Sequence, residues 1–195
     1  MSVPSLNTCY SLMDEYAMLD NIRAHSIMVA RVTQVLLQKL ADSPQQSAAP
    51  PRKLSLAGAL LHDIAKTPCL ENRCDHAKRG RDICLRLGYP EVAEVVREHV
   101  ILTEFSAERY QQGVFLAKEI VYYADKRVRH DEIVSLEERL EYILENYGNN
   151  DPERHRLIRE NFRKCRELEN FLFSVLGMTP DTVRSAVNGR ELSDF

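Results

Sequence analysis

The sequence contains no long apolar segment and no segment with the pattern of an export signal. A membrane-spanning helix needs about eighteen consecutive apolar residues, and the first twenty residues lack a basic stretch followed by an apolar one. The net charge is also small, at -3 from 26 basic and 29 acidic residues. We therefore expect a cytoplasmic protein that binds neither a membrane nor a nucleic acid duplex.

Glycine and proline are also few, at 7 and 8 residues, and strand-like alternation is absent over any useful length. Several of these residues fall between segments with 3.6-residue periodicity, which predicts an all-α fold. We expect helices over residues 5–19, 20–41, 54–67, 74–88, 91–99, 113–128, 135–148 and 151–177, and a short last helix that begins at Thr179-Pro180. Either Asp20 or Asn21 is expected to cap the second helix, and Pro68 to end the third.

The chain length of 195 residues suits one domain with a helical appendage. We place residues 1–148 in this domain and residues 149–195 in a C-terminal helical extension packed on it. The polar segment 42–53 has no periodicity and is expected to be a loop. The extension offers a surface for packing or for a homodimer, which the sequence leaves open.

The cysteines are odd in number and not obviously involved in chemistry. They are Cys9, Cys69, Cys74, Cys84 and Cys165. Because no export signal is present, we expect reduced thiols. Cys69 and Cys74 with His76 sketch a zinc site, but the spacing is loose and no fourth ligand lies nearby. We do not favour that alternative.

Four of the six histidines lie on or beside apolar helical stripes, and so do two aspartates. They are His25, His62, His76 and His99, with Asp63 and Asp125, whereas His130 and His155 lie among charges. For an isolated His-Asp pair, a helix-end carboxylate that turns to solvent is the more common explanation. A core seldom tolerates this many polar groups unless something satisfies them together. Metal ions with imidazole and carboxylate ligands do so.

The order His25, His62-Asp63 and Asp125 resembles the HD-domain superfamily of metal-dependent phosphohydrolases. His76 and His99 in addition resemble its two-metal branch, in particular the bacterial hydrolases of symmetrical diadenosine tetraphosphate. The resemblance covers about Ile22 to Arg139, through the segments AGALLHDIAK, DHAKRG, VREHV and EIVYYADK. It departs from that branch at Arg81, at Val100 and in the segment RVRHDE. A Gly88-Tyr89-Pro90 sequence occurs without the His-His-Glu expected before it, so we interpret it as a helix stop.

The resemblance implies an HD-domain helical bundle and a specific set of metal ligands. One metal ion would be held by His25, His62, Asp63 and Asp125, and a second by His76 and His99, with Asp63 bridging. Two divalent or mixed-valence ions are expected, iron or manganese first, with zinc, nickel, cobalt or magnesium as alternatives. The implied reaction is hydrolysis of a phosphate ester or anhydride of a nucleotide or other small phosphorylated compound by a metal-activated hydroxide.

Basic residues near these ligands are candidates for contacts with the phosphate. We expect Asp63, Lys66 and Arg79 to form the catalytic group, although Lys66 suits a solvated last helical turn equally well. Most of the other basic residues are expected to form a solvated face: Arg73, Lys78, Arg81, Lys126, Arg127 and Arg129. Two alternatives stay open, a di-iron oxygenase of the same fold and a metal-binding signalling module whose C-terminal helices bind a protein partner.

Overall fold

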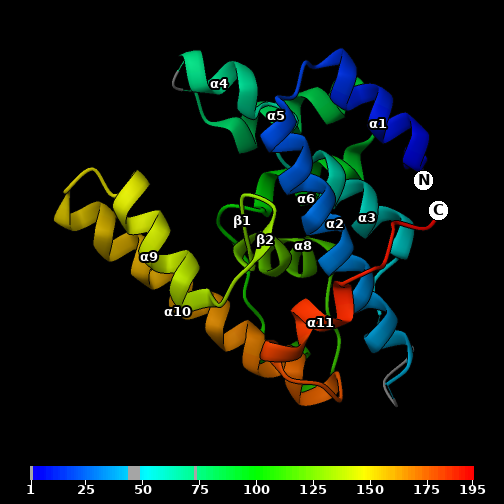
Figure 1. Cartoon of the computed structure of the whole chain (residues 1–195), viewed down its shortest axis with the longest axis vertical. Coiled ribbons are helices and arrows are strands. Elements are labelled where there is room, and N and C mark those ends of the chain that lie inside the picture. The colour runs from blue at the N-terminus through cyan, green and yellow to red at the C-terminus, as the bar shows by residue number, and fades with distance from the viewer. Residues whose placement is uncertain (1, 44–48, 73) are drawn as a thin grey trace.

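The computed structural model describes residues 2–43, 49–72 and 74–195, which excludes Arg73 and part of the expected loop 42–53. Nearly all of the regular secondary structure in the described chain is helical, which confirms the predicted all-α class (Figure 1). The helices are α1 (Leu6–Glu15), α2 (Asp20–Ala41), α3 (Arg52–Leu61), α4 (Lys66–Asn72), α5 (His76–Arg86), α6 (Pro90–Glu98), α7 (Ala107–Gln111), α8 (Ala117–Lys126), α9 (Leu136–Tyr147), α10 (Pro152–Val175) and α11 (Val183–Val187), with a 3-10 turn over Pro180–Thr182 before α11.

Helix α3 lies at the centre of the bundle and packs against α2, α6 and α8, while α5 packs on α6. The predicted stripe of α2 is buried from Ile22 through Leu40. Gly80 allows α5 to approach α6, since a Cβ atom there would lie only 2.7 Å from Val96 Cγ1. The apolar periodicity of these helices therefore produces one continuous core.

Polar side chains begin several helices as the sequence suggests. Ser5, Asp75, Ser135 and Asp151 each accept a hydrogen bond from a backbone N–H in the first turn that follows. The expected cap of α2 is wrong, because Leu19 is the N-cap residue and makes no side-chain hydrogen bond there. Asp20 instead lies in the first turn, where a carboxylate interacts favourably with the helix dipole.

The helix expected over residues 54–67 is interrupted at the His62-Asp63 pair. α3 ends at Leu61, residues 62–65 form turns, and α4 begins at Lys66. Pro68 does not end a helix but lies within the first turn of α4, where its missing N–H group is not needed. The His62-Asp63 pair therefore lies in a tight turn between two helices rather than inside one.

The prediction that all cysteines are reduced is wrong for one pair. Cys69 in α4 and Cys74 before α5 form a disulfide, with Cα atoms 4.7 Å apart. The two helices enclose a short connection that brings both residues within bonding reach. The zinc alternative loses its two sulfur ligands as a result. Cys9, Cys84 and Cys165 are free and buried.

The C-terminal part forms a helical hairpin beside the bundle. A two-stranded hairpin, β1 (Val128–Arg129) and β2 (Glu132–Ile133), leads from α8 into α9. α9 and α10 then pack along each other and project from the bundle, with α10 also touching α7 and α8 (Figure 1). The division at residue 148 stays a prediction. None of the helices in the described ranges is long and apolar enough to cross a bilayer.

Candidate metal centre

Five separate parts of the chain bring six polar side chains to one point, which we call the six-residue cluster: His25, His62, Asp63, His76, His99 and Asp125. His25 comes from within α2, and the His62-Asp63 pair follows α3. His76 begins α5, His99 follows α6, and Asp125 lies in the last turn of α8. Five of the six thus lie at helix ends, where a side chain can turn across the bundle.

Short distances join all six side chains. His25 Nε2 lies 3.0 Å from Asp125 Oδ1, which lies 3.7 Å from His62 Nε2. His62 Nε2 is in turn 3.4 Å from Asp63 Oδ2. The other carboxylate oxygen, Asp63 Oδ1, lies 3.4 Å from His76 Nε2 and 3.6 Å from His99 Nε2. Asp63 therefore directs one oxygen toward each half of the cluster.

Backbone carbonyl groups orient three of the four rings. Nδ1 of His25 donates to His130 O at 2.9 Å, Nδ1 of His62 to Ala59 O at 2.7 Å, and Nδ1 of His99 to Val96 O at 2.6 Å. A carbonyl oxygen only accepts, so Nδ1 carries the hydrogen in each ring. In the neutral rings this leaves the Nε2 lone pair directed into the cluster, as in metal-binding histidines.

Two polar atoms of the cluster are buried without a hydrogen-bond partner in the described chain. His62 Nε2 and Asp63 Oδ1 are buried and make no hydrogen bond, a costly arrangement in a protein interior. Ligands bound about 2.1 Å from one ion are about 3.0 to 3.4 Å apart in octahedral or tetrahedral geometry. The observed separations are close to this range. Two sets of donor atoms are close enough to share an ion: His25, His62 and Asp125, and His62, Asp63 and His99.

The charges around the cluster favour ionised carboxylates and mostly neutral rings. Burial alone would raise the pKa of Asp63, but Lys66 and His62 lower it well below its usual value. Burial would likewise raise the pKa of Asp125, but the close His25 ring and the charge of Lys126 lower it. Burial lowers the pKa of His25, and it lowers that of His76 to about 4. These residues therefore offer negative charge and free lone pairs at neutral pH.

His62 behaves differently from the other rings. Burial alone would lower its pKa, but Asp63 and Asp125 outweigh burial and raise it. The two carboxylates thus favour a positive charge at His62 Nε2, which a proton or a metal ion can supply. The donor set fits a divalent cation of the borderline class, which binds imidazole and carboxylate together.

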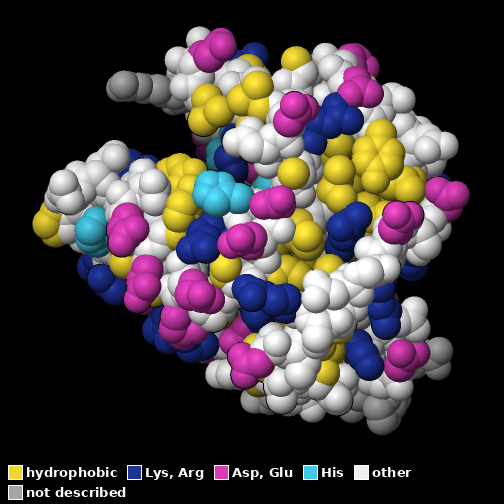
Figure 2. All heavy atoms as spheres, in the orientation of Figure 1, with side chains coloured by type: hydrophobic (Ala, Val, Ile, Leu, Met, Phe, Trp, Pro, Cys, Tyr) yellow, Lys and Arg dark blue, Asp and Glu magenta, His cyan; other side chains and the backbone are white. Residues whose placement is uncertain are grey.

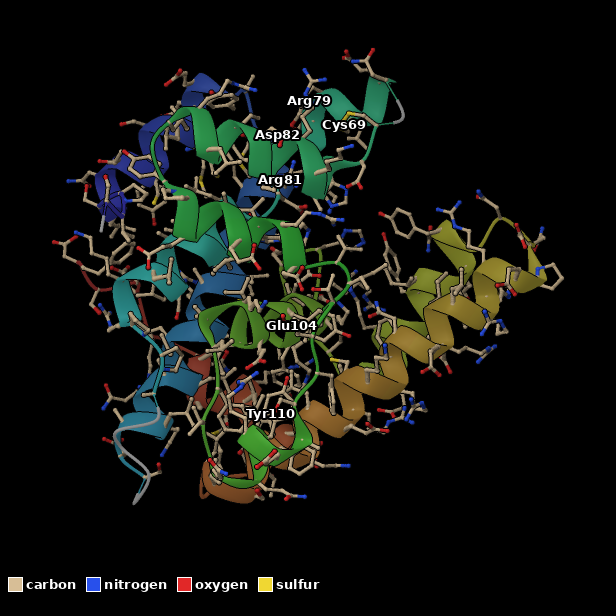
Figure 3. All side chains as sticks on the ribbon, turned by 180° about the vertical axis from the view of Figure 1, so that it is seen from behind. Cys69, Arg79, Arg81, Asp82, Glu104 and Tyr110 are labelled. Carbon is tan, nitrogen blue, oxygen red and sulfur yellow. A yellow bond between two sulfur atoms is a disulfide. The ribbon has the colours of Figure 1, made fainter. Side chains whose placement is uncertain are left out.

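The proposed catalytic residues lie in different surroundings. Lys66 Nζ donates to Asp63 Oδ2 at 2.6 Å and lines the pocket beside the cluster. Arg79 lies on the exposed face of α5 and is not among the residues that line this pocket (Figure 3). Its contact with a phosphate stays a prediction. Arg73, another candidate, lies outside the described residues.

Some basic residues are not the solvated side chains that we expected. Lys126 is buried and donates to the carbonyl oxygens of His99 and Val100, at 3.0 and 3.2 Å. Arg127 is also buried and binds main-chain oxygens of Val134 and Pro180. Lys126 thus supports the backbone around a cluster residue, and Arg127 ties the C-terminal segment to the bundle.

A pocket of about 390 Å³ opens onto the cluster between the bundle and the α9–α10 hairpin. Figure 2 shows the surface hollowed between this hairpin and the end that carries α4 and α5. Arg139 of α9 lines the pocket, with one terminal nitrogen 4.0 Å from Asp125 Oδ1. Neither Arg139 nor the carbonyl group of His130 was predicted from the sequence, because nothing in their local patterns differs from an ordinary exposed helix start or turn.

One comparison with known proteins gave a match. A family model described as "HD domain" matches residues 22–143, which is more than half of the chain and includes all six cluster residues. Comparison with curated proteins and with solved structures gave no significant match.

Proposed function

The chain belongs to the HD-domain family, and from this membership we propose that it is a metal-dependent phosphohydrolase. The substrate in this proposal is a phosphate ester or anhydride of a nucleotide or other small phosphorylated compound. The family membership supports a metal-dependent hydrolase in general. It does not extend to the diadenosine tetraphosphate hydrolase branch, so the nucleotide substrate is part of the proposal.

One observation carries the proposal: the Asp63 carboxylate stands between two groups of imidazole nitrogens, with His62 Nε2 on one side and those of His76 and His99 on the other. We propose that His25, His62, Asp63 and Asp125 hold one metal ion, and His76 and His99 a second, with Asp63 bridging. Such ions, when bound, lower the pKa of a water molecule and neutralise phosphoryl oxygens.

The reaction needs a water molecule, a phosphoryl group and a leaving oxygen. The water oxygen forms a new bond to phosphorus, the bond from phosphorus to the leaving oxygen breaks, and the leaving oxygen takes up a proton. In our proposal Lys66 binds a phosphoryl oxygen, since its ammonium group is already placed at the cluster by Asp63. Arg79 is a second proposed contact from α5.

The basic residues around the pocket favour phosphate hydrolysis over the di-iron oxygenase alternative. Lys66, Lys126, Arg139 and Arg154 all line the pocket, and a pocket rich in cationic groups suits an anionic substrate. The di-iron oxygenase alternative uses the same ligand types and predicts activity that needs oxygen.

Metal content and hydrolysis should be measured on the same preparation. We expect bound iron or manganese in elemental analysis, release of phosphate from at least one member of a nucleotide and small phosphate-ester panel, and loss of activity after chelation with recovery on adding metal. Activity should be equal with and without oxygen. A metal-loaded protein that hydrolyses no member of the panel, or that acts only with oxygen, would contradict the proposal.

A further inference from the structure

Exposed apolar side chains gather at the mouth of the metal-centre pocket. Val100 and Ile101, which follow α6, are 36% and 56% exposed, and Tyr147 of α9 and Leu157 of α10 are 44% and 53% exposed. All four line the pocket. They make up half of the large, exposed apolar residues in the described chain. Apolar side chains concentrated around one opening mark a binding surface more strongly than scattered ones do.

The pocket also contains a cationic side chain with unused donors. Arg139 is only 8% exposed, and no described residue accepts a hydrogen bond from its Nε. Its guanidinium group lies 5.4 Å from the centre of the Tyr142 ring and 4.0 Å from Asp125 Oδ1, too far for a hydrogen bond. A buried guanidinium has five N–H groups to satisfy. An anionic ligand in the pocket can accept hydrogen bonds from them.

Hydrogen bonds fix the two sides of the opening relative to each other. Asn161 Nδ2 of α10 donates to Val100 O at 2.9 Å, and Lys126 Nζ donates to the same oxygen at 3.2 Å. The hairpin is thus joined directly to the segment that follows His99. Its apolar residues therefore lie at a set distance from the metal-centre side of the pocket.

We propose that the α9–α10 hairpin, together with Val100 and Ile101 after α6, selects the substrate that enters this pocket. Arg139 binds an anionic oxygen of the substrate, and Val100, Ile101, Tyr147 and Leu157 cover an aromatic or other apolar group of the same molecule. This inference rests on the proposed function and narrows its substrate class. The volume of about 390 Å³ suits one small ligand. The preferred substrate is therefore a phosphate ester with an aromatic group, such as a mononucleotide, rather than a phosphate ester of a small polyol.

Kinetics with matched substrates tests this assignment. Thymidine 5′-monophosphate and 4-nitrophenyl phosphate carry an aromatic group, whereas glycerol 3-phosphate does not. We expect the wild-type protein to have a lower KM for the first two. Leu157→Ser should raise the KM for the aromatic substrates about tenfold, with little change in kcat or in the KM for glycerol 3-phosphate. The matched control is Leu85→Ser, because Leu85 on α5 is similarly exposed, at 48%, and does not line the pocket.

Variants of Arg139 test the anion contact. Arg139→Gln should raise the KM for all three substrates about tenfold or more while metal content stays unchanged. Arg139→Lys keeps the charge and should recover part of the loss. If Arg139 only supports Asp125, then both variants would lower metal content instead, and the assignment of Arg139 would be wrong. Circular dichroism melting curves identify a variant that fails to fold, in which case the Leu157 result decides.

The failures of the two proposals can be told apart. If the wild-type protein hydrolyses none of the three compounds, the proposed function loses support, but titration calorimetry with thymidine 5′-monophosphate should still show weaker binding to Leu157→Ser than to Leu85→Ser. Equal KM values for the three substrates, or equal binding by these two variants, would overturn the inference. So would a change from dimer to monomer on Leu157→Ser, since the apolar group would then be a subunit contact.

Discussion

The two walls of the pocket come from different parts of the chain and carry different kinds of side chain. The helical bundle supplies six ligand-type side chains, and main-chain carbonyl groups hold three of their rings in place. The α9–α10 hairpin supplies Arg139 and the half-exposed Tyr147 and Leu157, and the hydrogen bond from Asn161 to Val100 O joins it to the bundle. In our proposals, the chemistry that needs fixed geometry lies in the buried bundle, and the contacts that can vary with the substrate lie on the projecting hairpin.

The largest effect should come from the centre of the bundle wall. Asp63→Asn removes the negative charge that faces both halves of the cluster, so we expect metal content to fall and hydrolysis to drop by about a thousandfold or more. Elemental analysis and phosphate release measure the two effects. Asp82→Asn is the matched control, because Asp82 on α5 is paired with Arg81, has a side chain that is 41% exposed and does not line the pocket. Full activity in Asp63→Asn would contradict the proposal that the bundle wall of the pocket holds the metal ions.

A smaller effect is expected at the edge of the cluster. His76 has a side chain that is 28% exposed, so His76→Ala should cost little folding stability. We expect it to remove one metal ion per chain, retain the other, and lower activity about a hundredfold. Metal-to-protein ratios measure this. An unchanged metal-to-protein ratio would mean that His76 holds no metal ion. The proposed ligands would then be the other five residues of the cluster, around a single ion.

The two basic residues predicted to be catalytic can be compared directly. Lys66→Ala removes the ammonium group that touches Asp63 and lines the pocket, and we expect activity to fall about ten- to a hundredfold. Arg79→Ala changes an exposed side chain outside the pocket lining, so its effect should be smaller. Values of kcat and KM on the best substrate measure both. A larger loss in Arg79→Ala would mean that α5 also contributes to substrate binding.

The smallest effect on activity should come from the disulfide. Cys69 and Cys74 close a loop with a sequence separation of 5, and a loop this short stabilises the folded state by about 2 kcal/mol. Cys69→Ser should lower the free energy of unfolding by about this amount and leave activity nearly unchanged. Urea unfolding with and without a reductant measures it. A reductant-dependent loss of metal would instead show that the connection to α5 positions His76.

The periodicity of the sequence predicted the bundle, and three of the four histidines expected to face the core, His25, His62 and His99, are buried. Ile22, His25 and Val29 share one face of α2 because helical spacing alone decides which residues face the core. His130 and His155 were separated from the other four because charges surround them. Only the main-chain oxygen of His130, not its ring, contacts the cluster.

Local patterns did not predict where the chain departs from regular helix. The break after Leu61 follows no glycine or proline, and His62 Nδ1 instead bonds the carbonyl group of Ala59. Likewise, the disulfide depends on how the chain turns between α4 and α5, which the spacing of the two cysteines does not determine. Both contacts join residues only three to five positions apart, and they depend on local backbone geometry that the hydrophobic periodicity does not specify.

The amino-acid sequence alone determined the helical class and predicted which histidines and aspartates come together, since both follow from residue type and spacing. Only the tertiary structure decided that Asp63 faces two groups of histidines and that Arg139 lines the same pocket, near Asp125. The physical reason is that helical periodicity acts over a few residues. The distance between side chains a hundred residues apart, such as His25 and Asp125, depends instead on how whole helices pack.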